Sequence, residues 1–289
     1  MNPDAFPGGE DAAPRRTIVT PGDPPLPIAR AVVMGSCFST EVGGRLAACG
    51  IGVCLHPFGI LFNPASILAS LRRLEHPRPF TQADVIGREG RFVSFHHHGA
   101  FARDTPQAFL EEANESLKRA AAAFAAADTV ILTFGTSWVF RHLARNRVVS
   151  NCHKVPAREF RREFLPAAQI AGGFAPLLER HGDKQWIFTV SPIRHLADGA
   201  HGNQLSKANL LLAVETLRKR FAGGKGDSAR VRYFPAYEIL LDELRDYEWY
   251  APDGVHPSPE AAGRIADRFL DWAAVTSASR SSRLSGPSG

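Results

Sequence analysis

The sequence has no long hydrophobic run, and this absence narrows what the protein can be. No stretch of about 18 uninterrupted apolar residues occurs, which argues against a transmembrane helix. A secretory signal begins basic and continues apolar, whereas residues 1–14 are acidic and rich in proline and glycine. We therefore expect a protein that has no membrane span and works in the cytoplasm.

Cysteine is also scarce, with four residues in a chain of 289 and no C-x-x-C pair. Uneven spacing in a large chain without an export signal favours reduced thiols over a disulfide framework or a structural zinc site. The histidines at 96–98 invite a metal hypothesis, because His96 and His98 would share one face of a strand. No third ligand stands at a metal-binding spacing, so we expect no metal and no cofactor.

Positive charge is modest and dispersed. The net charge is +5 and the isoelectric point is about 9.2. Basic residues occur in scattered pairs, such as 72–73 and 161–162, rather than in one cluster. This distribution is typical of solvated faces, and we expect no nucleic-acid partner.

Composition divides the chain into three parts. Residues 1–27 hold proline and glycine clusters that cannot sustain a regular element, so they are predicted to be a flexible segment. Residues 277–289, rich in serine, arginine and glycine, are predicted to be a disordered tail. With 44% hydrophobic residues overall, residues 28–276 can form one folded domain.

Short apolar stretches alternate with amphipathic ones along that domain. Residues 129–134 are apolar and short, which predicts a strand buried on both faces in a parallel sheet covered by helices. Other strands are predicted near residues 31–34, 52–55, 186–190 and 231–235, and an excursion is predicted at 139–184. The chain is thus predicted to be a three-layer α/β sandwich with a mostly parallel central sheet. Functional loops should gather at the carboxyl ends of its strands.

Two motifs carry nucleophile chemistry. The sequence Gly35-Ser36-Cys37-Phe38-Ser39 follows the first predicted strand and precedes a helix, where backbone N–H groups and the helix dipole favour an anion. Near the other end, Asp253 stands three residues before His256, a spacing that lets a carboxylate orient an imidazole. Together they suggest a nucleophile and its base. The apolar, turn-rich residues 56–64 are expected to line a pocket.

These motifs, with Asn63-Pro64, Asn151-Cys152-His153-Lys154 and Ser191-Pro192-Ile193-Arg194-His195, resemble the GSCFA-domain family, which is itself similar to the SGNH or GDSL hydrolases. The resemblance covers roughly residues 28–272. It implies an SGNH hydrolase-like, flavodoxin-like fold.

The resemblance also implies roles for individual residues. Cys37 falls on the nucleophile position and Ser36 on the position before it. An alternative register makes Ser36 the nucleophile. The third possibility is that the turn is noncatalytic. Asp253 and His256 fall on the final dyad. The oxyanion-hole positions fall on Gly59 and on the turn from Gly135 to Ser137.

Two departures from the parent pattern affect the chemistry. A thiol replaces the usual hydroxyl, and near a helix N-terminus and an imidazole its pKa is expected to fall. Ser137 replaces an amide donor, and Asn63 and Asn151 are the candidates to restore it.

Further polar residues are candidates for substrate contact. Arg194, His195 and Lys207 could meet at one edge of the sheet and bind a carboxylate or phosphate. His153, in a loop after Cys152, could bind an anionic group or orient the site. Local backbone bonding or surface charge would explain them equally well. Trp138 and Phe140 are predicted to pack rather than to recognise a ligand.

The first hypothesis is an SGNH-like hydrolase or acyltransferase that acts on a small-molecule or carbohydrate-linked ester through a Cys37 (or Ser36), His256 and Asp253 triad. The alternative is a noncatalytic ligand-binding module that keeps the fold and the pocket. A metal hydrolase is a third possibility.

Overall fold

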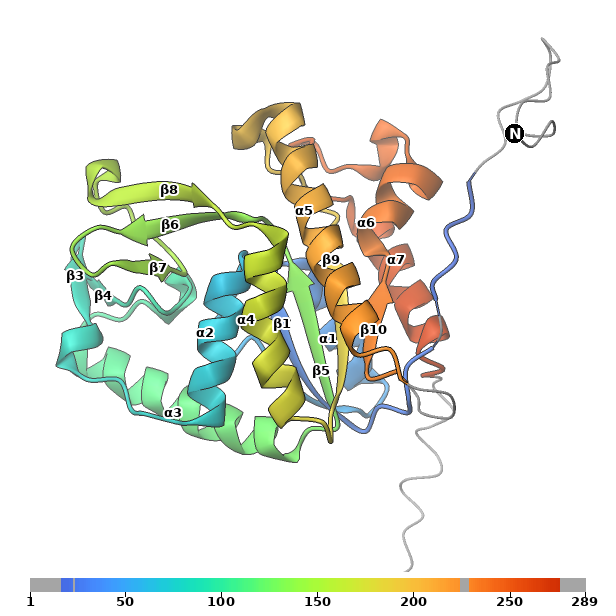
Figure 1. Cartoon of the computed structure of the whole chain (residues 1–289). Helices are drawn as coiled ribbons and strands as arrows, with labels where there is room; N and C mark the ends of the chain where they lie inside the picture. Colours follow the sequence, from blue (N-terminus) through green and yellow to red (C-terminus); the bar gives the residue numbers. More distant parts are fainter. Residues whose placement is uncertain (1–16, 23, 224–228, 276–289) are drawn as a thin grey trace, which may run out of the picture.

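A five-stranded parallel sheet forms the centre of the computed structural model, which describes residues 17–22, 24–223 and 229–275 (Figure 1). Its strands run in the order β10-β9-β5-β1-β2, and every neighbouring pair is parallel. Their bounds are β1 Arg30–Gly35, β2 Gly52–Leu55, β5 Thr129–Phe134, β9 Gln185–Val190 and β10 Val231–Phe234. Numbered one to five in chain order and read from β2, the strands follow the flavodoxin-like order 2-1-3-4-5. The predicted parallel sheet is confirmed.

Helices cover both faces of this sheet. Alternate side chains of β1 enter different cores: Val32 and Met34 pack on one side, and Ala31 and Val33 on the other. The first side is covered by α2 Pro64–Glu75, α3 Pro106–Ala126, α4 Ala167–Arg180 and α5 Gly199–Arg220. The second side is covered by α1 Phe38–Ala48, α6 Ala236–Glu238, the π-helix η6 Ile239–Leu244 and α7 Pro259–Trp272. The three-layer architecture is therefore confirmed, and all residues of β5 are buried.

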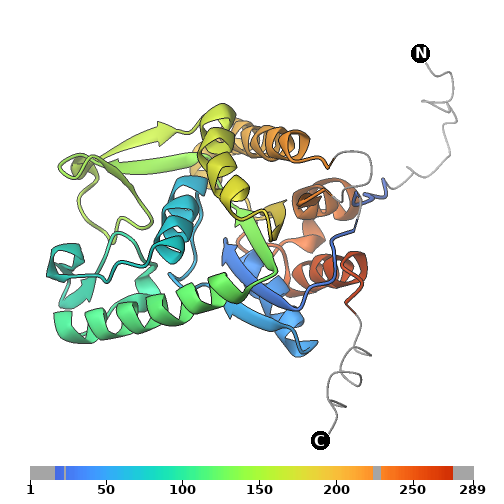
Figure 2. The same cartoon turned by 60° about the horizontal axis from the view of Figure 1, so that its bottom comes forward.

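A small antiparallel sheet interrupts the alternating pattern after β5. It consists of β6 Trp138–His142, β7 Arg147–Val149 and β8 Phe160–Phe164 in the order β7-β6-β8. In both views it lies beside α2, away from α7 (Figures 1 and 2). The predicted excursion at 139–184 thus becomes this sheet followed by α4. Its β6–β7 side supplies one wall of the cavity described below.

The three histidines do not share a strand, so that part of the sequence prediction is wrong. The hairpin of β3 Ile86–Arg88 and β4 Arg91–Val93 ends before them. His97 is 1% exposed among the rings of Phe58, Phe80, Phe101 and Phe109, and neither of its ring nitrogens has a hydrogen-bond partner.

The remaining short helices are η2 Gln82–Asp84, η3 Gly99–Phe101, η4 Ala157–Glu159, η5 Leu196–Asp198 and η7 Tyr247–Trp249.

The described residues before β1 make hydrogen bonds to the body of the fold. Trp272 Nε1 donates to the carbonyl of Gly22, and the backbone N–H of Leu26 donates to Gln185 Oε1. Residues 1–16 and 277–289 lie outside the described residues, and the division of the chain at 27 and 276 stays a prediction. Within the described ranges, no helix has both the length and the apolarity that a bilayer crossing requires.

Candidate active site

The turn after β1 requires glycine at its first position. Gly35 has a φ of +137°, and a Cβ atom there would lie 2.2 Å from the carbonyl oxygen of Thr133. The N–H of Ser36 donates to that same carbonyl at 3.1 Å, and the N–H of Leu61 donates to the carbonyl of Gly35 at 2.9 Å. These contacts fix Ser36 and Cys37 between β1 and α1, in the strand-to-helix turn that the sequence predicts.

Ser36 and Cys37 have different surroundings. Ser36 is 1% exposed, and its Oγ has no hydrogen-bond partner. Cys37 is half-buried at the N-cap of α1. Burial raises the pKa of the Cys37 thiol, although a backbone hydrogen bond opposes that shift. The expectation of a lowered thiol pKa is therefore wrong, because desolvation by burial outweighs the backbone hydrogen bond, and thiolate chemistry at Cys37 would need a base.

Asp253 and His256 form a hydrogen-bonded pair. Asp253 Oδ2 lies 2.7 Å from His256 Nδ1, and Oδ1 accepts from the backbone N–H groups of Val255 and His256 at 2.8 and 3.0 Å. These bonds lower the pKa of Asp253 to about 2, so the carboxylate is ionised at neutral pH. An ionised carboxylate accepts its hydrogen bond from Nδ1–H. His256 therefore has Nε2 available as a basic nitrogen.

His256 lines a cavity of about 450 Å³ at the carboxyl ends of the strands. The walls come from residues 62–63 after β2, Thr136 after β5, residues 193–195 after β9, and residues 255–256 before α7. The small sheet closes it with Trp138, Phe140 and residues 149–152. Four more of the predicted site residues lie here: Asn63, Asn151, Arg194 and His195. The expectation that residues 56–64 line a pocket is confirmed for Phe62 and Asn63.

Ser36 and Cys37 do not line this cavity, although they lie at the same edge of the sheet. Gly35 pairs with Thr133, and Thr133 pairs with Thr189, so β1, β5 and β9 end at one level. Strands at this spacing place the turn after β1 and the turn after β9 roughly 10 Å apart. Residues 61 and 62 join the two places: the Leu61 N–H binds the β1 end, and Phe62 lines the cavity.

Two backbone contacts position the cavity on the strand ends. The carbonyl of Phe62 accepts from the N–H groups of Gly135 and Thr136 at 2.8 and 3.0 Å. The N–H of Arg194 donates to the carbonyl of Val255 at 3.0 Å. The second contact attaches the loop of the Asp253–His256 pair to the end of β9.

The two asparagine side chains present their amide nitrogens in the same way. Asn63 Oδ1 accepts from the N–H of Ser66 at 2.8 Å and so caps α2, while Asn151 Oδ1 accepts from the N–H of His153 at 2.8 Å. A backbone donor on each oxygen fixes the amide orientation. Each Nδ2 group can then donate to a ligand in the cavity.

Four of the predicted oxyanion and substrate-binding residues lie outside the cavity lining. Gly59 has a φ of +76° and packs against His98, and Gly135 abuts the carbonyl of Phe62. His153 Nε2 lies 2.8 Å from the carbonyl of Ser94. Ser137 is fully buried; its Oγ donates to the carbonyl of Ser206 and accepts from Asn209 Nδ2. Within the same turn, Thr136 faces the cavity instead.

Lys207 lies beneath the cavity rather than in it. Its side chain is 0% exposed, and Nζ donates to the carbonyls of Gly135 and Ser191 at 2.8 Å each. Burial lowers its pKa to about 7. The suggested substrate contact is therefore wrong for Lys207, which lies on the buried face of α5 with Leu210 and Val214.

His195 and the two aromatics complete the site. Burial, followed by the nearby Lys207 charge, lowers the pKa of His195 to about 4, so this ring is neutral at pH 7. Trp138 and Phe140 line the cavity, and Phe140 is 41% exposed. The sequence prediction that they only pack missed this exposure.

The parts of the chain described hold no group of three or more His, Cys, Asp or Glu side chains arranged for a metal ion.

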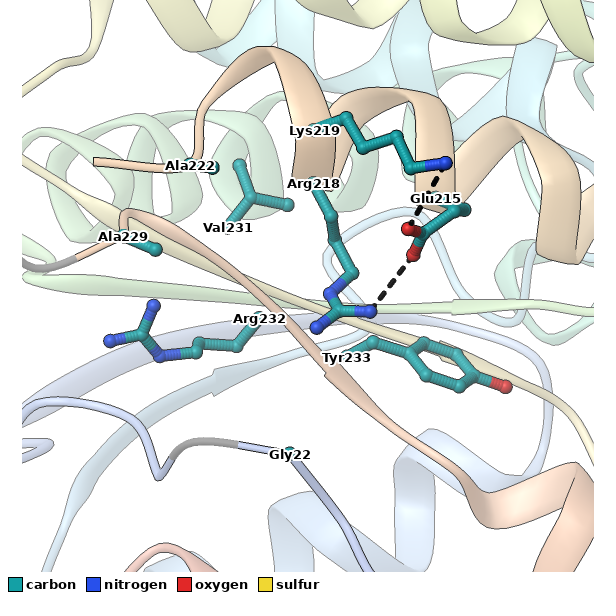
Figure 3. A pocket seen from close by; sticks show the side chains of 9 residues that line it. All are labelled: Gly22, Glu215, Arg218, Lys219, Ala222, Ala229, Val231, Arg232 and Tyr233. Carbon is teal, nitrogen blue, oxygen red and sulfur yellow. Dashed lines mark hydrogen bonds and ion pairs between the residues drawn. The ribbon is translucent and has the colours of Figure 1, made fainter. Parts of the chain in front are cut away.

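A separate hollow of about 210 Å³ lies near the amino end of β10 and the last turns of α5 (Figure 3). It is thus remote from the carboxyl ends of the strands. Its one carboxylate, Glu215, pairs with both Arg218 and Lys219, and Arg232 donates to the carbonyl of Pro24. It contains no nucleophile or imidazole, so the cavity with His256 is the better candidate.

The GSCFA family model matches residues 30–269. A protein from Streptococcus pneumonia, provisionally described as a platelet activating factor, has a solved structure with a TM-score of 0.40 and 9% identity, covering 84% of this chain and 82% of that one. A second solved structure has a TM-score of 0.40 and 16% identity, covering 87% of this chain and 97% of that one. No curated protein sequence matches. These structural likenesses are too distant to inform the site.

Proposed function

This chain belongs to the GSCFA family, and we propose that it is an SGNH-like hydrolase or acyltransferase that acts on an ester-type bond. The observation that carries the proposal is the Asp253–His256 pair on a cavity at the carboxyl ends of parallel strands. A carboxylate that orients an imidazole, at the same sheet edge as a strand-to-helix turn with a thiol and a hydroxyl, supplies the groups that nucleophilic acyl transfer needs. The relationship to the SGNH hydrolases is part of the proposal.

In the proposed reaction Cys37 Sγ attacks the ester carbonyl while His256 Nε2 takes the thiol proton. The tetrahedral intermediate collapses to a thioester on Cys37, and His256 gives its proton to the departing alkoxide. Water or an acceptor hydroxyl then attacks the thioester, with His256 again as the base; the C–S bond breaks, the acid or new ester leaves, and Cys37 Sγ takes the proton back from His256. Asp253 stabilises the imidazolium in each half-reaction. The raised thiol pKa makes this base necessary.

The oxyanion is assigned to donors that can reach the cavity. The Nδ2 groups of Asn63 and Asn151 have their amide orientations fixed. The backbone N–H of Cys37 is proposed to complete the set, because that of Ser36 already donates to the carbonyl of Thr133. The parent pattern would use Ser137 and Gly59, but the hydroxyl of Ser137 is already bonded internally. One lost donor costs about 2.7–4 kcal/mol of transition-state stabilisation, which is why replacement donors matter.

Cys37 is the preferred nucleophile because it is the more accessible of the two neighbours. Ser36 has a buried hydroxyl without a partner, a feature that keeps it as the alternative. Turnover of activated esters by Cys37→Ala and Ser36→Ala separates the two. Cys54→Ala is the matched control, since Cys54 is also half-buried and burial raises its thiol pKa as well.

A noncatalytic ligand-binding module is the second candidate. It is favoured by one observation: neither Ser36 nor Cys37 lines the cavity that holds His256. Wild-type protein that hydrolyses activated esters no faster than His256→Ala would select this candidate. A loss of turnover in His256→Ala with the fold intact would select the enzyme.

A further inference from the structure

Arg194 stands on the cavity wall without a carboxylate within 4 Å among the residues that the structure describes. Other arginines near this edge are neutralised: Arg162 pairs with Asp198, and Arg264 pairs with Glu260. Arg194 therefore contributes an uncompensated positive charge to the candidate site.

The guanidinium of Arg194 is held in place by aromatic rings. Its Cζ lies 3.9 Å from the ring centroid of Tyr250 and 5.2 Å from that of Tyr247. One Nη1 hydrogen bond reaches the carbonyl of Gly254 at 3.5 Å. Stacking fixes the plane of the group while leaving most of its five N–H donors unused. Such a fork matches the two oxygens of a carboxylate or phosphate.

No side chain in the cavity opposes this charge. None of the fourteen lining residues is Asp or Glu. The nearby Asp253 carboxylate is occupied by His256 and two backbone N–H groups. His195 is neutral at pH 7 because its pKa is lowered to about 4. Apolar neighbours such as Phe62, Ile193 and Val255 reduce the local dielectric and strengthen an ion pair with Arg194.

We propose that the site takes an ester carrying an anionic group, a carboxylate or a phosphate, which the Arg194 guanidinium binds through two N–H groups. That the ligand is an ester rests on the proposed function, but the anion site can be tested without turnover. Arg194 would then select substrates, while the Asp253–His256 pair performs the chemistry.

Binding is measured first, by calorimetry of the full chain with inorganic phosphate and, separately, with succinate. We expect wild-type protein to bind at least one anion, and the better ligand identifies the group as phosphate or carboxylate. Arg194→Gln should weaken that binding about 10- to 100-fold, the usual range for a charged hydrogen bond. Arg194→Lys, which keeps the charge but not the fork, should lie between. Arg264→Gln is the matched control, because Arg264 also lies over an aromatic ring but is paired with Glu260.

Selectivity is measured next, as the ratio of kcat/KM for mono-4-nitrophenyl succinate to that for 4-nitrophenyl acetate. Arg194→Gln should lower this ratio about 10-fold or more, and Arg264→Gln should leave it unchanged. Failure of both esters to react would refute the proposed function while leaving the binding result to decide the anion site. Wild-type protein that binds neither anion at millimolar concentration, or an Arg194→Gln variant with unchanged affinity, would overturn the inference.

Discussion

His256 Nδ1 lies 2.7 Å from Asp253 Oδ2, and the other oxygen of that carboxylate is held by the backbone N–H groups of Val255 and His256. Backbone hydrogen bonds within the loop therefore hold the carboxylate in place independently of the imidazole. Asp253 can be substituted while the His256 ring that it orients remains.

Asp253→Asn tests the orienting role. The amide keeps the size of the carboxylate but cannot stabilise an imidazolium and can favour the wrong tautomer. We expect kcat/KM for an activated ester to fall on the order of 10²- to 10⁴-fold with the fold retained. Asp267→Asn, which removes an exposed carboxylate paired with Arg45, is the control. Equal activity in the two variants would remove Asp253 from the mechanism.

Asn63 offers a way to separate a structural role from a catalytic one. Asn63→Asp keeps the oxygen that caps α2, removes the Nδ2 donor and adds a negative charge to the cavity wall, so kcat should fall about 10²-fold or more while the cap hydrogen bond is retained. Asn63→Ala loses the cap as well and should destabilise the protein by about 1 kcal/mol. Midpoints from thermal unfolding and kcat from ester turnover give the comparison. A fully active Asn63→Asp variant would exclude the donor role.

His97 should make the protein sensitive to acid. Burial lowers its pKa well below 6.5, so below about pH 6.5 the unfolded chain takes up a proton that the folded chain refuses. Stability is therefore present above that pH and is lost as the pH falls. His97→Phe removes two unpaired buried nitrogens and keeps a ring among the four phenylalanines. Urea unfolding at pH 7 and pH 5 should show a smaller loss for the variant than for wild type; an equal loss would refute this origin.

Lys207→Met tests the buried ammonium that joins the ends of β5 and β9. Methionine fills similar space but leaves the carbonyls of Gly135 and Ser191 without this donor. We expect a loss of about 1–3 kcal/mol in the free energy of unfolding, measured with denaturant. Lys219→Met, at a mostly exposed position on the same helix, should change stability far less.

Some features of the fold and the site could be predicted from the sequence, and others could not. The apolar run of β5 predicted a doubly covered parallel sheet, and the three-residue spacing of Asp253 and His256 predicted their contact, because both depend on local pattern. Ser137 could not be placed in this way: a rotation within one turn buries its hydroxyl and turns Thr136 to the cavity. Lys207 was misplaced because its partners are strand-end carbonyls 16 and 72 residues away in sequence. The predicted direction of the Cys37 thiol pKa shift was wrong for a similar reason, because the burial of a side chain depends on the tertiary structure.

Trapping the acyl-enzyme would identify the nucleophile directly. Full-length protein is mixed with 4-nitrophenyl acetate, quenched in acid, and mapped by peptide mass spectrometry. We expect acetylation of Cys37 in wild type and in Cys54→Ala, none at position 37 in Cys37→Ala, and slower formation in His256→Ala. Acetylation of Ser36 instead would shift the nucleophile by one residue. No label on either residue, together with undiminished turnover in the Ser36→Ala/Cys37→Ala double variant, would contradict the central claim.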